Sequence, residues 1–292
     1  MSQNPNVRVG FIGLGAMGMP MAMHLHGKGL LAMVANRSKA NVLIMQRELG
    51  VAAANSDADF SLCNVVVLCL PYDADVLAHV GSLAKVLTPG SIVIDHSTVS
   101  VETAKQCGEL LAKAKIGFID APVSGGVEGA RNGKLSIMVG ASVADLQSVQ
   151  AVLQTYAARI THMGDVGSGQ ATKAVNQILV AGINEAVCEG LAFAEKLGLN
   201  ADQLIPTLMS GAAANWFLEK RGATMLRSEF TPGFKVAHMR KDLGIVQSMA
   251  KSLGIETTCI DQALHDYSEL VEHGMADADT SALIQLKRKA FD

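Results

Sequence analysis

The most constraining feature of the sequence is a set of three glycines near its start, spaced Gly13-x-Gly15-x-x-Gly18. They follow the apolar segment Val9–Ile12 and precede a helix-compatible segment, residues 19–28, so the order is strand, tight turn, helix. In such a turn the first glycine permits a sharp bend, the second lets a pyrophosphate approach the backbone, and the third lets the helix pack closely on the strand. The free amides and positive dipole end of the helix then face the phosphates. We predict a dinucleotide-binding loop rather than a plain structural turn, formed by Gly13, Leu14, Gly15, Ala16, Met17 and Gly18.

The residues after the second predicted strand, Leu31–Ala35, indicate which dinucleotide binds. An NAD site usually has Asp or Glu there to bind the ribose hydroxyls, whereas the 2′-phosphate of NADP needs donors and positive charge. This chain has Asn36, Arg37 and Ser38, and no carboxylate between Leu30 and Arg47. A guanidinium provides a charged fork of donors suited to a phosphate. The alternative is that Arg37 is an ordinary solvated charge, but we predict that NADP(H) is preferred and that NAD(H) remains possible.

Further apolar runs predict a parallel sheet. Residues 64–71 and 91–95 are almost continuously apolar, as is typical of parallel strands covered by helices on both faces. The segments between the strands, residues 73–84 and 101–113, have helical apolar spacing. The predicted fold is α/β, with an N-terminal Rossmann-type, doubly wound and mainly parallel sheet that residues 118–123, 135–140 and 160–163 complete.

The composition changes at residues 164–169, and no strand pattern follows. Residues 170–197 have the length and apolar content of a long buried helix, and Gly198 is its expected stop. Further helices are predicted over residues 200–210, 216–226, 235–253, 258–273 and 281–289, the last with Asp279 or Thr280 as its cap. The chain therefore divides into a dinucleotide-binding domain, residues 1–165, and an all-α C-terminal domain, residues 166–292, for substrate binding and oligomerisation.

Composition restricts the partners. The net charge is −3 and basic residues do not cluster, which argues against nucleic acid and favours a small-molecule substrate. The hydrophobic content of 49% exceeds what a monomer's core requires, so a homo-oligomer is expected. The longest apolar run, Val65–Pro71, is too short to span a bilayer, and the first residues lack the regions of a signal peptide. We expect a cytoplasmic protein that does not bind a membrane.

Neither cysteine nor histidine spacing indicates a metal site or a disulfide framework. The five cysteines are widely spread without C-x-x-C spacing, so they are expected to be reduced core residues: Cys63, Cys69, Cys107, Cys188 and Cys259. The eight histidines match no metal-binding motif, and no Gly-x-Ser-x-Gly nucleophile motif is present. We predict no metal.

Hydride transfer to or from a carbinol carbon requires a group that moves the hydroxyl proton, and Lys173 is the candidate. It lies in the first turns of the long helix, and Asn176, three residues on, is expected to project from the same face toward the interdomain cleft. Burial can bring a lysine into the range of acid–base catalysis near neutral pH. Most helix lysines are solvated, but the residues around Lys173 are rich in Ala, Val and Ile.

A second candidate is the segment Ser124-Gly125-Gly126, which follows a predicted strand. Adjacent glycines leave backbone N–H groups uncovered and can form a small anion pocket suited to a carboxylate. A flexible surface loop is the equally weighted alternative.

Together these motifs resemble the β-hydroxyacid dehydrogenase family, also called the 3-hydroxyisobutyrate dehydrogenase-like family, over nearly the whole chain. The resemblance rests on four segments in family order: residues 10–22, 120–126, 167–176 and 241–243. One departure is His24, where many members carry Asn. The resemblance implies a Rossmann-type domain followed by a helical domain that mediates dimer or tetramer formation.

The same resemblance assigns roles to single residues. Lys173 is implied as the general acid/base, Ser124, Gly125 and Gly126 as binding the substrate carboxylate, and Asn176 as positioning the substrate. Thr98 and Pro71, with the neighbouring Leu70, match cofactor contacts. Lys241 matches a lysine close to the nicotinamide and the substrate, and Asp242 is expected to support the local structure.

The segments 36–38 and 235–243 resemble most the branch of NADPH-dependent reductases of short aldehyde acids, such as glyoxylate, succinic semialdehyde and tartronate semialdehyde. The alternatives are an NAD-dependent 3-hydroxyisobutyrate dehydrogenase and, from another class, a non-catalytic nucleotide-binding protein on the same fold. Imine reductases usually lack the lysine found here at position 173, and 6-phosphogluconate dehydrogenases place His beside their Asn, where this chain has Val175. The substrate, the physiological direction and the choice between dimer and tetramer are not fixed by the sequence.

Overall fold

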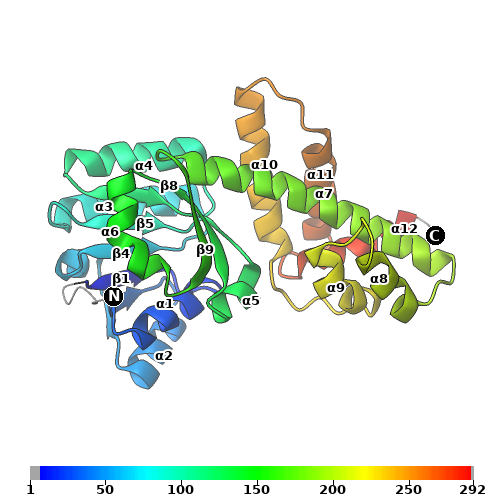
Figure 1. Cartoon of the computed structure of the whole chain (residues 1–292), viewed down its shortest axis with the longest axis horizontal. Coiled ribbons are helices and arrows are strands. Elements are labelled where there is room, and N and C mark those ends of the chain that lie inside the picture. The colour runs from blue at the N-terminus through cyan, green and yellow to red at the C-terminus, as the bar shows by residue number, and fades with distance from the viewer. Residues whose placement is uncertain (1–6, 291–292) are drawn as a thin grey trace. The chain divides into compact units, whose positions relative to one another are not determined.

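The computed structural model describes residues 7–290, except for the side chain of residue 290. Contacts divide the chain into two compact units, Met1–Lys173 and Ala174–Asp292. The first unit holds a mainly parallel sheet with helices, and the second is helical, so the predicted fold class is confirmed (Figure 1). The division falls after the first turn of the long helix because that turn contacts the sheet, whereas the sequence predicts a boundary at residue 165.

The first unit contains a sheet of nine strands within the described residues. They are β1 Val9–Ile12, β2 Leu31–Ala35, β3 Ala52–Ala53, β4 Val65–Leu68, β5 Ile92–Asp95, β6 Gly117–Asp120, β7 Val123–Ser124, β8 Leu135–Gly140 and β9 Ala157–Gly164. Their order is β3-β2-β1-β4-β5-β6-β8-β7, with β9 beside β8. The first six strands pair in parallel, and β8 runs antiparallel to β6 and β7. The chain therefore reverses its winding between β1 and β4, where ligands bind in sheets of this kind.

Helices cover both faces of the sheet. They are α1 Gly18–Gly27, α2 Lys39–Leu49, the 3₁₀ turn η1 Asp57–Leu62, α3 Asp73–Val86, α4 Val101–Lys113, α5 Gly126–Arg131 and α6 Val143–Leu153. Val65 and Val67 of β4 belong to the core that includes residues of α1, α2 and α6. The alternating residues Val66 and Leu68 belong to the core with α3 and α4, which Figure 1 shows beside each other. Burial on both faces explains why β4 is apolar at every position.

Some elements differ from the sequence-based prediction. The strand expected over residues 118–123 is two strands, because the chain leaves β6 at Asp120 and enters β7 only at Val123. Pro122, which lies between them, has no N–H to donate to a ladder. The short or amphipathic elements β3, α2, α5, α6 and β7 were not predicted, since their apolar patterns are weak or span few residues.

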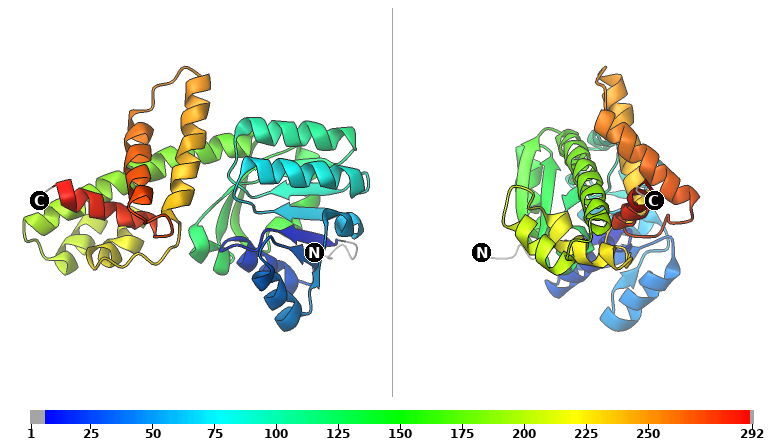
Figure 2. Two further views of the ribbon diagram at one scale, coloured as in Figure 1. Left: turned by 180° about the vertical axis from the view of Figure 1, so that it is seen from behind. Right: turned by 90° about the vertical axis from the view of Figure 1, so that its right-hand side faces the viewer.

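The second unit is built on the long helix α7, Ser168–Lys196, which begins in the first unit. It continues with α8 Ala201–Met209, α9 Trp216–Leu226, α10 Val236–Ser252, α11 Thr258–Glu272, the 3₁₀ turn η2 Thr280–Leu283 and α12 Ile284–Ala290. Helices α10 and α11 pack along each other (Figure 2). The single helix expected over 281–289 is instead η2 followed by α12, because Asp279 accepts a hydrogen bond from Ser281 N and caps a tighter turn.

Helix α7 is, within residues 7–290, the one helix long and apolar enough to cross a membrane by length and composition. One such helix is weak evidence for a span, because the central helix of a protein core passes the same test. Its polar residues Gln177 and Asn184 are buried against other helices of the unit, and Asn184 donates a hydrogen bond to Tyr267. These contacts are typical of a core helix.

All five cysteines are free thiols. Cys63, Cys107 and Cys188 are buried, and burial raises the pKa of Cys63 to about 11. The expectation that every cysteine lies in the core is wrong for Cys259, which is exposed on α11, and Cys69 is only partly buried. The residue type alone does not show which cysteines are buried and which are exposed.

Candidate active site

The three glycines of the first turn are required for different reasons. Gly13 has φ +104°, and a Cβ there would lie 2.2 Å from the Cys69 carbonyl oxygen. At Gly18 a Cβ would lie 1.8 Å from the Gly13 carbonyl oxygen, so α1 packs directly on the turn. At Gly15 a Cβ would meet no protein atom within 4 Å. The fold therefore needs Gly13 and Gly18, while glycine at position 15 keeps the space next to the backbone open for a ligand.

The loop between these glycines is held by two asparagines. Leu14 is buried, and its N–H donates to Asn36 Oδ1 over 2.9 Å while its carbonyl accepts from Asn41 Nδ2. Gly15 and Ala16 are exposed, and α1 has no side-chain cap and no acidic residue in its first turn. The amides at the start of α1 can thus bind an anion without competition from a protein carboxylate. Asn41, a residue that sequence reasoning missed, fixes this loop.

The end of β2 presents a polar, basic segment. Asn36 uses its side chain internally, because it also donates from Nδ2 to Ser38 O over 2.9 Å. Arg37, Ser38 and Lys39 are exposed, and Ser38 forms no side-chain cap at the start of α2. Lys39 is a second cation here that the sequence prediction did not include.

The strands β4 and β5 end at the same edge of the sheet, where the other predicted cofactor residues lie. Leu70 and Pro71 follow β4, and Thr98 follows β5; all three are partly buried. Ser97 is fully buried and accepts a hydrogen bond from Leu70 N over 2.8 Å. The structure therefore brings Leu70 and Pro71 beside the segment that carries Thr98, at the edge where ligands bind in open α/β sheets.

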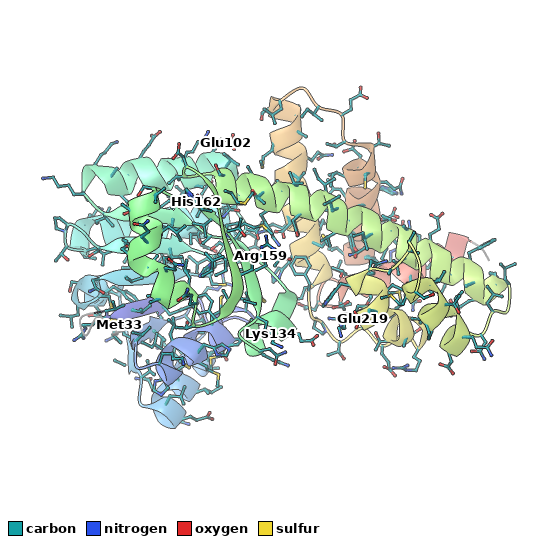
Figure 3. The ribbon with its side chains drawn as sticks, in the orientation of Figure 1. Met33, Glu102, Lys134, Arg159, His162 and Glu219 are labelled. Atoms are coloured by element: carbon teal, nitrogen blue, oxygen red, sulfur yellow. The ribbon has the colours of Figure 1, made fainter. Side chains whose placement is uncertain are left out.

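The segment predicted to bind a carboxylate has an unusual backbone. Ser124 ends β7, Gly125 has φ +122°, Gly126 has φ +60°, and α5 begins at Gly126. Residues other than glycine rarely adopt these backbone conformations, so both glycines are needed to turn the chain from β7 into α5. Lys134, labelled in Figure 3, lies where the chain passes from α5 to β8. The two glycines lead the chain directly from β7 into α5.

Lys173 lies close to this turn. Its side chain is on the second turn of α7, the residue is 9% exposed, and Nζ donates to the Val123 carbonyl oxygen over 3.0 Å. Val123 directly precedes Ser124. The predicted acid/base and the predicted carboxylate-binding segment are thus brought together within the first unit.

Two further buried residues, Asp120 and Gln170, meet at the start of α7, and sequence reasoning gave them no role. Asp120, at the end of β6, accepts from Gly167 N over 2.7 Å and from Gln170 N over 2.8 Å. Burial raises the pKa of Asp120, and these backbone hydrogen bonds oppose the rise. The Gln170 side chain donates to Ser97 O and accepts from Val99 N. The segments that contain Asp120 and Gln170 were both recognised in the sequence, but the hydrogen bonds between them were not predicted.

In the helical unit, the predicted substrate residues Asn176 and Lys241 belong to one polar chain. Asn176 Nδ2 donates to Gln177 Oε1 over 2.8 Å, and Gln177 Nε2 donates to Asp242 Oδ2 over 2.7 Å. Lys241 Nζ lies 2.8 Å from Asp242 Oδ1. Asp242 therefore holds both α7 and the lysine on α10. Burial and then the Lys241 charge lower the pKa of the nearby His238.

Within residues 7–290 no group of three or more His, Cys, Asp or Glu side chains is placed to hold a metal ion. His96, buried after β5, instead forms hydrogen bonds with Ala121 O and with the Tyr156 hydroxyl, at 2.6 and 2.8 Å. His162, labelled on β9 in Figure 3, contacts Ala141 O. These contacts are structural.

Comparison with known proteins gives the family. Residues 8–164 match the model of the NAD binding domain of 6-phosphogluconate dehydrogenase, and residues 167–287 match that of the NAD-binding domain of NADP-dependent 3-hydroxyisobutyrate dehydrogenase. The chain belongs to the β-hydroxyacid dehydrogenase family. This dehydrogenase is 34% identical to 2-hydroxy-3-oxopropionate reductase of Escherichia coli, over 96% of each chain. It is 36% identical to an uncharacterised oxidoreductase of Shewanella frigidimarina, over 97% of this chain and 99% of the relative.

A solved structure is similar along its whole length. The 3-hydroxyisobutyrate dehydrogenase of Mycobacterium tuberculosis, determined with L-serine, has a TM-score of 0.87 and 30% identity, and the match covers 97% of this chain and 99% of that one. The β-hydroxyacid dehydrogenase described here is therefore an oxidoreductase with NAD(P)-binding domains.

Proposed function

We propose that this dehydrogenase interconverts a small 3-hydroxy or other short hydroxy carboxylic acid and its semialdehyde, with NADP(H) as the preferred cofactor and Lys173 as the general acid/base. The substrates that fit best are tartronate semialdehyde, glyoxylate and succinic semialdehyde. The similarity to 2-hydroxy-3-oxopropionate reductase supports the first of these, because 2-hydroxy-3-oxopropionate is tartronate semialdehyde.

The observation that carries the proposal is the environment of Lys173. Its ammonium group is largely buried and bonded to the backbone of the segment that leads into Ser124, Gly125 and Gly126. Burying a lysine is costly, so this position next to the segment predicted to bind a carboxylate is specific to the fold. A non-catalytic nucleotide-binding protein would not need it.

Each residue then has a task in the reaction. The glycine loop would bind the pyrophosphate of the dinucleotide, whose nicotinamide would supply or accept the hydride. In the reducing direction Lys173 Nζ gives a proton to the oxygen of the aldehyde, and in the oxidising direction it takes the proton from the hydroxyl group. Ser124, Gly125 and Gly126 bind the carboxylate of the substrate, and Asn176 and Lys241 orient it, as the resemblance to the family implies.

The preference for NADP(H) is supported by the residues after β2. Arg37, Ser38 and Lys39 offer two charges and a hydroxyl donor at an uncapped helix start, where a 2′-phosphate is stabilised. No carboxylate in this segment is available for the ribose hydroxyls of NAD.

A spectrophotometric screen tests the function. NADPH and NADH are each combined with glyoxylate and with succinic, methylmalonic and tartronate semialdehydes, and the corresponding hydroxy acids are tested with the oxidised cofactors. We expect NADPH oxidation with at least one aldehyde acid. Higher activity with NAD⁺ and 3-hydroxyisobutyrate would instead support the alternative, an NAD-dependent 3-hydroxyisobutyrate dehydrogenase; the Mycobacterium tuberculosis relative is named for that substrate. No turnover with any pair would contradict the proposed reaction.

We also propose that the protein is a homodimer or homotetramer assembled through the helical unit. Exposed apolar side chains follow α7: Val175, Leu179, Ile183, Phe193 and Leu197, each between 38% and 61% exposed. An apolar stripe of this length on a lone chain is typical of an interface. Light scattering after size exclusion is expected to show an oligomer that Leu179→Glu disrupts, and a monomeric parent would contradict the proposal.

Cytoplasmic location and absence of nucleic-acid or membrane binding stay predictions.

A further inference from the structure

The N-terminus of α7 differs from those of the helices that have a local side-chain cap. The helices α4, α6, α8 and α9 are capped by the residue that precedes each of them: Ser100, Ser142, Asn200 and Asn215. At α7 the acceptor is the carboxylate of Asp120, which bonds Gly167 N and Gln170 N from a distant part of the sequence. A local cap stabilises one helix. This long-range one ties the helix that carries Lys173 to the end of strand β6.

Using the carboxylate of Asp120 as a cap requires a charged group to be buried. Asp120 is fully buried, and the hydrogen bonds described for its side chain come from backbone N–H groups at the helix start. Burying a carboxylate costs several kcal/mol unless hydrogen bonds and the helix dipole compensate it. A charge retained under these conditions constrains the helix end strongly.

Glycines bring the helix into direct contact with the strands. A Cβ at Gly169 would lie 2.5 Å from Met138 O and 2.6 Å from Asp120 O. A Cβ at Gly140, on β8, would lie 2.3 Å from Asp120 Oδ1 and 2.8 Å from Gly169 N. The first turn of α7 therefore packs closely on the backbone of β6 and β8 and on the Asp120 carboxylate, so its position can vary little.

Lys173 follows one turn later, about 4.5 Å along the axis from Gln170. Its Nζ bonds Val123 O, and Val123 lies three residues after Asp120. The segment from Asp120 to Val123 is thus attached to α7 at both ends, by the carboxylate at one end and by the lysine at the other. Ser124 and the two glycines follow directly.

We propose that Asp120 is a positioning residue that holds the first turn of α7 on the sheet and thereby fixes Lys173 Nζ relative to the segment Val123–Gly126. It does not touch the reacting atoms. This inference rests on the proposed role of Lys173 in catalysis, but the contacts that carry it do not depend on that role.

The test is Asp120→Asn, which keeps the size of the side chain and replaces one acceptor by an NH₂ donor that faces helix N–H groups. The matched control is Asp145→Asn, which alters a partly buried carboxylate that accepts from Ser142 Oγ at the start of α6 and has no contact with α7 among the hydrogen bonds of the described residues. The first readout is the rate at which an amine-reactive reagent modifies Lys173 in the substrate-free protein, followed by peptide mass spectrometry. Lys287, largely buried in the helical unit, reports general loosening.

We expect Lys173 to be modified several-fold faster in Asp120→Asn, with Lys287 unchanged and no effect of Asp145→Asn. The second readout is kinetic. We expect kcat to fall about 100-fold, because a displacement of the Lys173 ammonium by about 1 Å is enough for a loss of this size. The NADPH dissociation constant is expected to stay within about threefold of the parent's. An unchanged modification rate of Lys173, or equal acceleration at Lys287, would overturn the inference.

If Asp120→Asn does not fold, Gly169→Ala gives the same test, since the added Cβ must push the first turn away from Asp120 O. Unchanged Lys173 modification in Gly169→Ala would likewise overturn the inference. Comparison with Lys173→Ala separates the two proposals. If that variant keeps full turnover while Asp120→Asn still exposes Lys173, the positioning role stands and the acid/base role fails.

Discussion

The two units of the chain use buried charge in different ways. In the sheet unit the core is apolar on both faces, and the buried charges Asp95, Asp120 and Lys173 lie at the ends of β5 and β6 and near the start of α7. In the helical unit Lys287 contacts both Glu185 and Asp266 between α7, α11 and α12. Buried charge thus lies at strand ends close to the proposed acid/base in the first unit, whereas the Lys287 cluster joins three helices in the second.

The largest effect is expected from Lys173→Ala, which should remove catalysis and spare the fold. We expect kcat to fall by about 10²–10⁴, the usual contribution of general acid–base catalysis. NADPH binding, followed by fluorescence titration, should change by no more than a few-fold, because the glycine loop does not include this residue. If the variant turns over every substrate that the parent accepts at a rate within a few-fold of the parent's, Lys173 is not the general acid/base. The exposed Lys85 provides the control substitution to alanine.

Lys287→Met in the helical unit is expected to lower the stability of the fold rather than to act on catalysis directly. The hydrogen bonds to Asp266 and Glu185 raise the pKa of Lys287 although burial alone would lower it. Removing the lysine leaves two carboxylates close together without their cation, which should lower the free energy of unfolding by about 3–5 kcal/mol. Urea titration measures this loss. Lys220→Met, which breaks an exposed pair with Glu219, should cost less than about 1 kcal/mol, and equal losses would show that burial is unimportant here.

A pH effect sharpens the comparison inside the sheet unit. Burial lowers the pKa of His96 to about 4, although its contact with Ala121 O acts in the other direction. As the pH falls below 6.5, the unfolded chain therefore binds a proton at His96 that the folded chain does not bind. The contribution of His96 to the free energy of unfolding is fully present above pH 6.5 and is lost as the pH falls toward 4. The loss amounts to roughly 3 kcal/mol.

His96→Gln should flatten the dependence of stability on pH between 6.5 and 4, as measured by urea titration at several pH values. His26→Gln, at a partly exposed position on α1, is the control and should leave the slope unchanged. A slope in His96→Gln equal to that of the parent would assign the acid sensitivity to other groups.

The smallest effect is expected at the end of β2. Arg37→Ala should weaken NADPH binding by about 10- to 100-fold, the range of one hydrogen bond to a charged group, and NADH binding hardly at all. Isothermal titration with both cofactors measures the difference, and Arg47→Ala on the exposed side of α2 is the control. Equal weakening of NADH would mean that Arg37 does not bind the 2′-phosphate.

Sequence patterns predicted the sheet unit better at its centre than at its edges. β1, β4 and β5 are buried on both faces, so their apolar runs are continuous and easily recognised. The strand β3 has two residues, α5 has six, and their patterns are too short to carry a period. η2 was mistaken for helix because the cap at Asp279 is visible in the sequence but the tighter turn it starts is not.

The sequence alone determined what depends on local backbone chemistry. Glycines at 13, 15 and 18 after a strand, Arg37 without a nearby acid, and Lys173 in an apolar helix face each constrain the chain within a few residues, so the fold class and the family followed from them. Only the tertiary structure decided which distant groups meet: Asn41 with Leu14, Asp120 with the start of α7, and Lys287 with Glu185 and Asp266. Such contacts leave no periodic trace in the sequence, because each is selected by the packing of elements tens of residues apart.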